Sequence, residues 1–264
     1  VYLGKVKKLL PSLKAAFVDI GDEKEAFVHY LDLGLYFEAF DEFVKRLNPN
    51  TDAKGIYKHI KPGKILEKEG RIENVLSPGQ MIIVQIVKEP ISTKGSRLTA
   101  EISLAGRNIV LLPFAEKVSV SQKISSKEEK RRLETLVKSI LPKNYGAIIR
   151  TAAEGKNAAV LDAEAMSLVE KWEDSWKKLA KSKAVQLLFT EYSKTTTILR
   201  DLLNDSFSNI YVNNETIYEE TRKYISLISP EQEKIVKLYK EKAPIFDHFE
   251  VTRQIKSSFG KVVP

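Results

Sequence analysis

The chain has 264 residues, of which 43% are hydrophobic and 30% are charged, a composition that favours a soluble protein with hydrophobic cores. It contains no run of about 18 apolar residues, which excludes a membrane-spanning helix, and no cysteine, which excludes disulfide bonds and thiolate metal sites. The formal net charge of +8 is compatible with a polyanionic partner but does not identify one.

The first part of the chain has the pattern of a small β-barrel. Short alternating or β-branched runs within residues 1–30 are separated by the turn sequences PS and GDEK, which predicts an antiparallel meander. Residues 31–80 are less regular and contain one helical stretch, YFEAFDEFVKRL. The run MIIVQIVKEP and the start of residues 98–113, LTAEISLAGRNIVLLP, bring the total to about five strands. Such a set of strands is typical of a barrel of the OB type.

After residue 125 the periodicity changes from that of strands to that of helices. SSKEEKRRLETLVKSILP has a serine cap, an acidic first turn and one apolar face, which predicts a helix ending at Pro142. YGAIIRTAAE predicts a strand. DAEAMSLVEKWEDSWKKLAKSKA predicts a long helix that begins with acids, ends with lysines, and has Trp172 and Trp176 on its apolar stripe.

From about residue 184 strand and helix patterns alternate. The segments in order are VQLLFTEY, TTTILRDLL, SNIYVNN, ETIYEETRKYISLI, KIVKLYKE and PIFDHFEVTRQIKSSFG. This alternation predicts an α/β layer, which has too few strands to be complete by itself. The chain also starts without methionine and directly in a strand pattern. We therefore expect it to be part of a longer protein.

Two aromatic residues are candidates for RNA binding. Phe17 and Phe27 lie on the expected barrel, with several lysines nearby in sequence. Single-stranded RNA is held by stacking its bases on aromatic rings while basic groups follow the phosphates. The alternative is that both rings fill the barrel interior, and the residue pattern alone favours that alternative.

Two polar features are candidates for anion binding. Arg150 ends an apolar strand, where its guanidinium could hold a phosphate and Thr151 could add a hydroxyl. A solvated strand end is the alternative that the pattern favours. Gly106 interrupts the apolar stretch 98–113, and backbone N–H groups near it could bind an anion. A simple bulge between two strands is the favoured alternative there.

Three long segments resemble the ribonuclease E/G family of bacterial endoribonucleases. GKVKKLLPSLKAAFVDIGDEKEAF is similar to the family's signature at the start of an S1-type OB domain. TKGSRLTAEISLAGRNIVLLP and IIRTAAEG resemble two further family segments, and the likeness continues in order to the end of the chain. The resemblance implies an α+β multidomain fold: an S1-type OB β-barrel, an α/β 5′-sensor region and a partial RNase H-like α/β layer. The matching ranges are 1–100, with an insertion at about 31–75, then 101–190 and 191–264.

The resemblance also implies two RNA sites. Phe17, Phe27 and Lys94 match family residues that contact single-stranded RNA. Arg150 and Thr151 match a pair that belongs to a pocket sensing a 5′-monophosphate. A terminal monophosphate is a compact dianion, which a fork of arginine donors can hold.

Further positions complete this implied pocket. Main-chain groups at Gly106 and Val110 match those that take part in it, whereas Arg107 and Asn108 gain no role and are expected to face solvent. The family often has two basic residues after a serine in the segment SQKI, but the first of them is Gln122 here. We therefore expect either that Lys123 substitutes or that the phosphate is held more weakly.

The resemblance finally implies a single-strand-specific, magnesium-dependent endoribonuclease of mRNA decay and rRNA processing in the bacterial cytoplasm. In the family, two aspartates hold magnesium in a DNase I-like subdomain beyond the region matched here, and cysteines that bind zinc at a subunit link come later still. No catalytic or metal-binding residue is therefore expected within these 264 residues. The expected partners are single-stranded RNA with a 5′-monophosphate and, for the full-length protein, further copies in a dimer or tetramer. A stand-alone RNA-binding or scaffold module without nuclease activity is the alternative.

Overall fold

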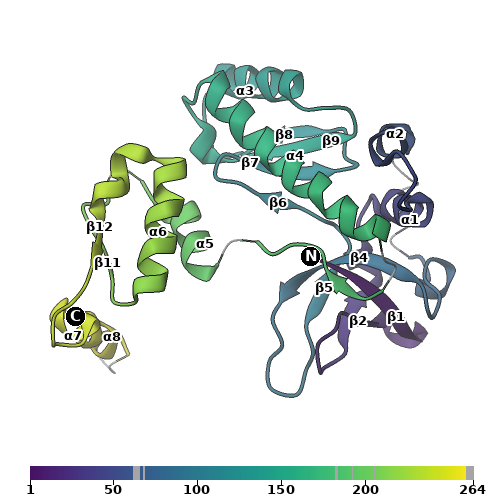
Figure 1. The fold of residues 1–264 in the computed structure, drawn as a ribbon, viewed down its shortest axis with the longest axis horizontal. Helices are drawn as coiled ribbons and strands as arrows, with labels where there is room; N and C mark the ends of the chain where they lie inside the picture. Colours follow the sequence, from purple (N-terminus) through teal and green to yellow (C-terminus); the bar gives the residue numbers. More distant parts are fainter. Residues whose placement is uncertain (62–65, 68, 182–183, 192, 205, 260–264) are drawn as a thin grey trace. The chain divides into compact units, whose positions relative to one another are not determined.

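A computed structural model shows two compact units, Val1–Glu191 and Tyr192–Pro264 (Figure 1). Each unit has its own hydrophobic core. No helix in the described part of the chain combines the length and the apolar character needed to cross a membrane. The structure describes residues 1–61, 66–67, 69–181, 184–191, 193–204 and 206–259.

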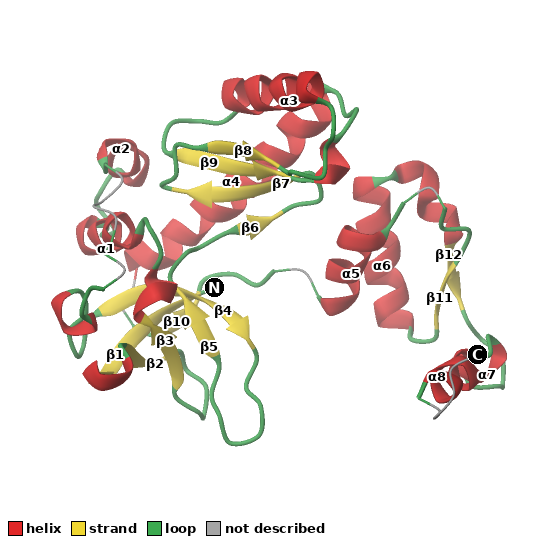
Figure 2. Cartoon of the chain, turned by 180° about the vertical axis from the view of Figure 1, so that it is seen from behind, coloured by secondary structure: helices red, strands yellow, loops and turns green. Residues whose placement is uncertain are grey.

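The first unit begins with a closed five-stranded barrel (Figure 2). Its strands follow the order β1-β2-β3-β5-β4 and close by pairing β4 with β1. Only β3 and β5 pair in parallel. This is the OB-like barrel that the sequence predicts. The strands are Tyr2–Leu10 (β1), Ala15–Asp19 (β2), Ala26–His29 (β3), Met81–Lys88 (β4) and Arg97–Thr99 (β5), with the short helix Pro11–Leu13 after β1.

Short helices occur in the described part of the segment between β3 and β4. They are Tyr30–Leu33, Phe37–Arg46 (α1), Ala53–His59 (α2) and Ile72–Asn74. The helix predicted from YFEAFDEFVKRL is confirmed as α1. In α1, the ring of Phe40 packs edge-on against that of Phe114, with 4.9 Å between the ring centroids. The ring of Phe43 packs against that of Trp176, with 5.2 Å between the centroids. The same hydrophobic core contains Leu3 and Ile83 of the barrel, so this aromatic cluster joins the barrel to the second half of the unit.

A four-stranded sheet, in the order β6-β7-β9-β8, forms the second half of the first unit. Helices α3 and α4 pack on one face of it, through Leu133 and Leu161 against Ile109 and Ile149. Ser126 caps α3 by accepting the N–H of Glu129, as predicted. The elements are Leu104–Ala105 (β6), Ile109–Pro113 (β7), Val118–Val120 (β8), Lys127–Ile140 (α3), Tyr145–Ile149 (β9), Thr151–Ala153 and Ala158–Lys181 (α4).

Two local expectations are wrong. The segment VQLLFTEY does not belong to the C-terminal α/β layer, because Gln186–Leu187 (β10) pairs with Tyr2 and Leu3 of β1. Strand β2 pairs with β1 only from Lys5 onward, which leaves that end of β1 open to another partner. Helix α4 begins at Ala158, before the acids that were expected to lead it, because Asn157 accepts the N–H of Val160.

The second unit contains a two-stranded parallel sheet with helices. Strands Ile210–Val212 (β11) and Val236–Leu238 (β12) are connected through Glu215–Ile228 (α6) and the short helix Pro230–Ile235. The predicted alternation of strands and helices is therefore present from residue 194 onward. The remaining helices are Lys194–Leu202 (α5), Ile245–His248 (α7) and Val251–Ser258 (α8).

Candidate nucleic-acid interface

Two phenylalanines lie side by side on the outside of the barrel. Phe17 of β2 stands directly opposite Phe27 of β3, and both side chains are half-buried. Their strand neighbours Ala16, Val18 and Ala26 are fully buried. Because side chains alternate between the two faces of a strand, the small residues fill the interior and the rings face outward. The alternative in which both rings fill the barrel is therefore wrong.

Basic side chains stand on both sides of this pair. Lys8 of β1 is the cross-strand partner of Phe17, and Arg97 of β5 is the partner of Phe27. The lysine is exposed. The guanidinium of Arg97 donates to both carboxylate oxygens of Asp32, at 3.0 and 3.1 Å. Lys8, Phe17, Phe27 and Arg97 thus form a row across four neighbouring strands, which we name the barrel row. Rings between cations are suited to stacking bases and holding phosphates.

Lys94 lies in the turn that connects β4 to β5. Its side chain is exposed, and its backbone N–H and carbonyl pair with those of Ile91, at 3.0 and 3.2 Å. The ammonium of Lys24 donates to the carbonyl of Ser92 in the same turn. The turn is therefore anchored to the segment before β3, and Lys94 lies three residues before Arg97 of the barrel row.

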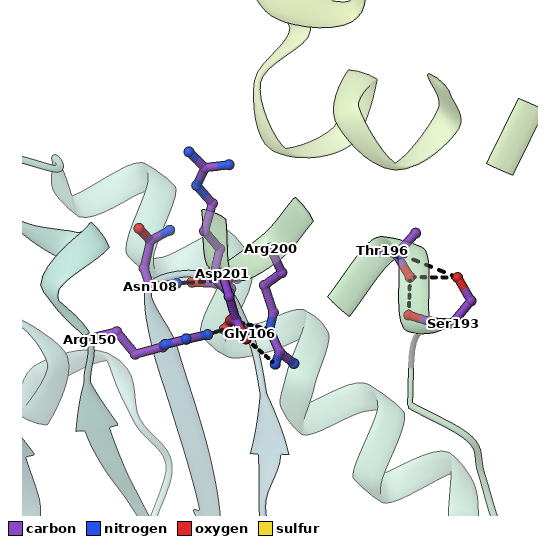
Figure 3. A network of polar contacts seen from close by, with 9 residues as sticks. Gly106, Asn108, Arg150, Ser193, Thr196, Arg200 and Asp201 are labelled. Carbon is purple, nitrogen blue, oxygen red and sulfur yellow. Dashed lines mark hydrogen bonds and ion pairs between the residues drawn. The ribbon is translucent and has the colours of Figure 1, made fainter. Parts of the chain in front are cut away.

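Arg150 is held at two points by the turn between β6 and β7. Its Nη1 donates to the carbonyl of Gly106 at 2.9 Å, and its backbone N–H donates to the carbonyl of Asn108 at 2.8 Å (Figure 3). Asn108 is buried and Arg107 is half-buried, so the expectation that both face solvent is wrong. Residues 106–108 connect the antiparallel strands β6 and β7, so Gly106 lies at a hairpin turn and not at a bulge within a strand.

Two hydroxyl groups and a lysine gather beside Arg150. The Oγ1 of Thr151 lies 3.1 Å from the Oγ of Ser121, which also accepts the backbone N–H of Lys123 at 3.3 Å. The side chains of Thr151, Gln122 and Lys123 are exposed. Arg150, Thr151 and Lys123 therefore come together at one end of β9. Ser121 was not among the predicted residues, although it is the serine of the SQKI segment.

The backbone at Gly106 and Val110 is engaged within the fold. The N–H of Gly106 donates to the carbonyl of Ile109 at 2.8 Å. Val110 lies in β7, which pairs with β6 on one side and with β9 on the other. The group of Gly106 that meets Arg150 is its carbonyl, which is an acceptor. A carbonyl orients a guanidinium but cannot donate to a phosphate.

A carboxylate binds the other N–H groups of this turn. Glu164 of α4 accepts the N–H of Arg107 and, at 2.9 Å, that of Asn108. Burial raises the pKa of Glu164, and the N–H groups of Asn108 and Arg107 act in the opposite direction. A Cβ added to Gly106 would lie 2.5 Å from Oε1 of Glu164 and 2.8 Å from the carbonyl oxygen of Ile109. Close approach therefore requires glycine here. Backbone N–H groups near Gly106 do bind an anion, and it is the chain's own carboxylate.

Known proteins are similar to this sequence over all or nearly all of its length. The model of the family described as "Ribonuclease E/G family" matches residues 103–264, which include the Arg150 site. The chain belongs to the ribonuclease E/G family. Ribonuclease G of Haemophilus influenzae is 34% identical over 263 residues, and ribonuclease G of Escherichia coli is 32% identical over 263. Ribonuclease E of a Nostoc species is 30% identical over 262 residues.

These alignments cover unequal shares of the two proteins. They include 100% of this chain for both ribonucleases G and 98% for the ribonuclease E. They include 50% of each ribonuclease G and 34% of the ribonuclease E. The chain thus spans half the length, or less, of these curated family members.

Across residues 1–61, 66–67, 69–181, 184–191, 193–204 and 206–259, no group of three or more His, Cys, Asp or Glu side chains could hold a metal ion. The groups with a chemistry of interest in this part of the chain are the rings and cations on the barrel and the donors around Arg150.

Proposed function

We propose that this chain is the RNA-binding and 5′-monophosphate-sensing portion of a single-strand-specific endoribonuclease that acts in mRNA decay and rRNA processing in the bacterial cytoplasm. Hydrolysis of the phosphodiester is assigned to a magnesium-dependent region outside these 264 residues. Family membership supports the nuclease part of the proposal. The sensing part of the proposal rests on one observation: the β6–β7 turn accepts two hydrogen bonds from Arg150, one from its guanidinium and one from its backbone N–H.

The proposal assigns each range of the chain a task. Residues 1–100 form the S1-type domain that holds the RNA, and residues 101–190 form the 5′ sensor. Residues 191–264 contribute to an RNase H-like layer, which other parts of a full-length dimer or tetramer would complete. Zinc at a subunit link belongs to that larger assembly.

The Arg150 site offers a terminal phosphate a set of matched donors. A guanidinium presents N–H groups in a planar fork, and bonds from it to a phosphate are strengthened by charge. The hydroxyl of Thr151 adds a donor, and the exposed ammonium of Lys123 adds a second positive charge. Because Gly106 and Asn108 already hold Arg150, little side-chain freedom is lost on binding. A 5′-hydroxyl end has no phosphate to fill the site, and a triphosphate is larger.

The barrel row would hold the RNA strand itself. Stacking on Phe17 and Phe27 requires unpaired bases, which explains a preference for single strands. The exposed cations of Lys8 and Lys94 would follow the phosphates. In this proposal the barrel binds any single-stranded RNA, and the Arg150 site recognises the phosphate at its 5′ end.

The change Arg150→Ala tests the proposal. Binding of single-stranded RNA with a 5′-monophosphate should weaken roughly tenfold to a hundredfold, as expected for lost hydrogen bonds to a charged group. Binding of the same RNA with a 5′-hydroxyl should change little. Fluorescence anisotropy of end-labelled RNA measures both. The matched control is Arg46→Ala, which removes an arginine of α1 that pairs with Glu42.

Equal losses for the two RNAs would contradict the sensing role. The nuclease assignment is tested separately, by magnesium-dependent cleavage of single-stranded RNA by the full-length protein. A full-length protein that binds RNA without cutting it would favour the stand-alone binding module instead.

A further inference from the structure

We propose that Glu164 is a positioning residue for recognition of the 5′-phosphate: its carboxylate fixes the β6–β7 turn, and the turn fixes the guanidinium of Arg150. This inference rests on the proposed function, since it adds a residue to the same site. Glu164 would not touch the phosphate. It acts through the backbone of residues 106–108.

The turn needs an acceptor from elsewhere in the fold. Arg107 and Asn108 lie between β6 and β7, so their N–H groups have no place in the ladder of those two strands. Buried N–H groups without an acceptor are unfavourable and rare. Glu164 accepts both: Oε1 accepts from Arg107, and the N–H of Asn108 donates to Oε2 at 2.9 Å and to Oε1 at 3.2 Å. The carboxylate therefore determines the shape of the turn.

The carboxylate is itself firmly placed. Its helix neighbours Leu161 and Ala165 are fully buried in the core beneath the sheet. Among the described residues, Glu164 has no ion-pair partner, so its negative charge is matched by N–H dipoles alone. A rigid helix thus presents an anion to a nest of backbone donors, an arrangement known to bind anions.

One peptide unit connects Glu164 to Arg150. The carbonyl of Gly106 and the N–H of Arg107 belong to the same planar group, and in a trans peptide they point in opposite directions. The N–H donates to Glu164, and the carbonyl accepts from Nη1 of Arg150 at 2.9 Å. Fixing one end of this plane fixes the other. The carboxylate also polarises the peptide and so strengthens the bond on its far side.

A second connection runs through Asn108. Its N–H donates to Glu164, while its carbonyl accepts the backbone N–H of Arg150 at 2.8 Å. Both the backbone and the guanidinium of Arg150 therefore depend on the turn that Glu164 holds. Gly106 completes the arrangement, because any side chain there would occupy the space of the carboxylate.

The variants Glu164→Ala and Glu164→Gln, made in the whole chain, test the inference. The measured quantity is the ratio of the dissociation constants for single-stranded RNA with a 5′-hydroxyl and with a 5′-monophosphate. This ratio should fall about tenfold in Glu164→Ala, equivalent to one hydrogen bond to a charged group. It should fall less in Glu164→Gln, whose amide oxygen still accepts one N–H. Binding of the 5′-hydroxyl RNA should stay unchanged.

Adding formate to the binding assay distinguishes loss of the carboxylate from general destabilisation of the fold. Formate is small enough to replace the missing carboxylate, so it should restore part of the ratio in Glu164→Ala and none in Glu164→Gln. Chloride at equal ionic strength is the control for salt. Asp162→Ala is the matched variant, because Asp162 is an exposed acid on the same helix.

The outcomes separate the inference from the proposed function. A wild-type chain that does not distinguish the two RNAs would overturn the proposed function itself. A wild-type preference that survives unchanged in both Glu164 variants would overturn the positioning role alone, as would equal losses for both RNAs. Should Glu164→Ala fail to fold, Glu164→Gln and Gly106→Ala decide, because a Cβ at position 106 would lie 2.5 Å from Oε1 of Glu164, too close for the carboxylate to stay in place.

Discussion

Removing the two barrel rings should weaken RNA binding far more than it weakens the fold. Phe17 and Phe27 are half-buried and lie opposite each other, and a cross-strand aromatic pair contributes about 0.2–1 kcal/mol to a sheet. Stacking on a ring is worth about 1–3 kcal/mol per base. Each change to alanine should therefore raise the dissociation constant of single-stranded RNA roughly fivefold to a hundredfold.

Fluorescence anisotropy with a 5′-hydroxyl RNA isolates this contribution from the Arg150 site. Phe17→Ala, Phe27→Ala and the double variant would be compared at one salt concentration, with thermal unfolding to confirm the fold. The control is Phe259→Ala in the second unit, where the ring is 88% exposed. If the rings hold separate bases, the two losses should add, and if they hold one base the double variant should lose less than the sum.

Wild-type affinity in both single variants would refute the stacking role of the rings. A second refutation would come from RNA with abasic positions. Such RNA cannot stack, so it should bind wild type and double variant equally. A loss of affinity for abasic RNA on removing the rings would show that they act through the fold of the barrel.

Three further changes test other parts of the structure. Lys123→Ala should weaken binding of 5′-monophosphate RNA by a fewfold, with a smaller effect at high salt because the side chain is exposed; a loss independent of salt would argue against a charge effect. Tyr57→Phe should lower the free energy of unfolding in urea by about 1–3 kcal/mol, since it leaves the buried N–H of Phe114 without its acceptor; an unchanged midpoint would contradict this. The side chain of Arg132 holds the pKa of Glu129 at about 2, below its usual value of 4.5. Wild type should therefore be more stable than Glu129→Gln above pH 4.5, and this advantage should disappear as the pH falls through about 2.

The barrel and the helices were predictable because their signals are local. Alternating apolar residues and turn sequences mark the strands, and Ser126 marks the start of α3. Which face of the barrel the two phenylalanine rings occupy was harder to predict, because Ala16 and Val18 on the other face of β2 are as apolar as Phe17. The polar residue Asp19 shares the face of Phe17, and it was the available signal that this face is outside.

Contacts between distant segments leave no local pattern in the sequence from which they could be predicted. Glu164 is one acid among many on a helix, and the N–H groups it accepts lie 56 and 57 residues earlier in the chain. The pairing of β10 with β1 connects residues at opposite ends of the first unit. Arg97 likewise joined the barrel row only through the parallel pairing of β3 and β5. Family resemblance named Arg150 and Gly106 as candidates but could not show that the carbonyl of Gly106 accepts from Arg150.

The aromatic cluster around Phe40, Phe43, Phe114 and Trp176 gives the first unit a property that neither binding surface has alone. Because it joins the barrel to the sheet that bears Arg150, the spacing between the two surfaces is built into the fold. The unit would then discriminate between single-stranded RNAs by their length. With the proposed roles of the two surfaces, a strand long enough to reach from its 5′ end to the rings would gain both contacts through a high effective concentration, whereas a shorter one would gain a single contact. Affinity plotted against RNA length should rise in a step, and the length at the step reports the spacing.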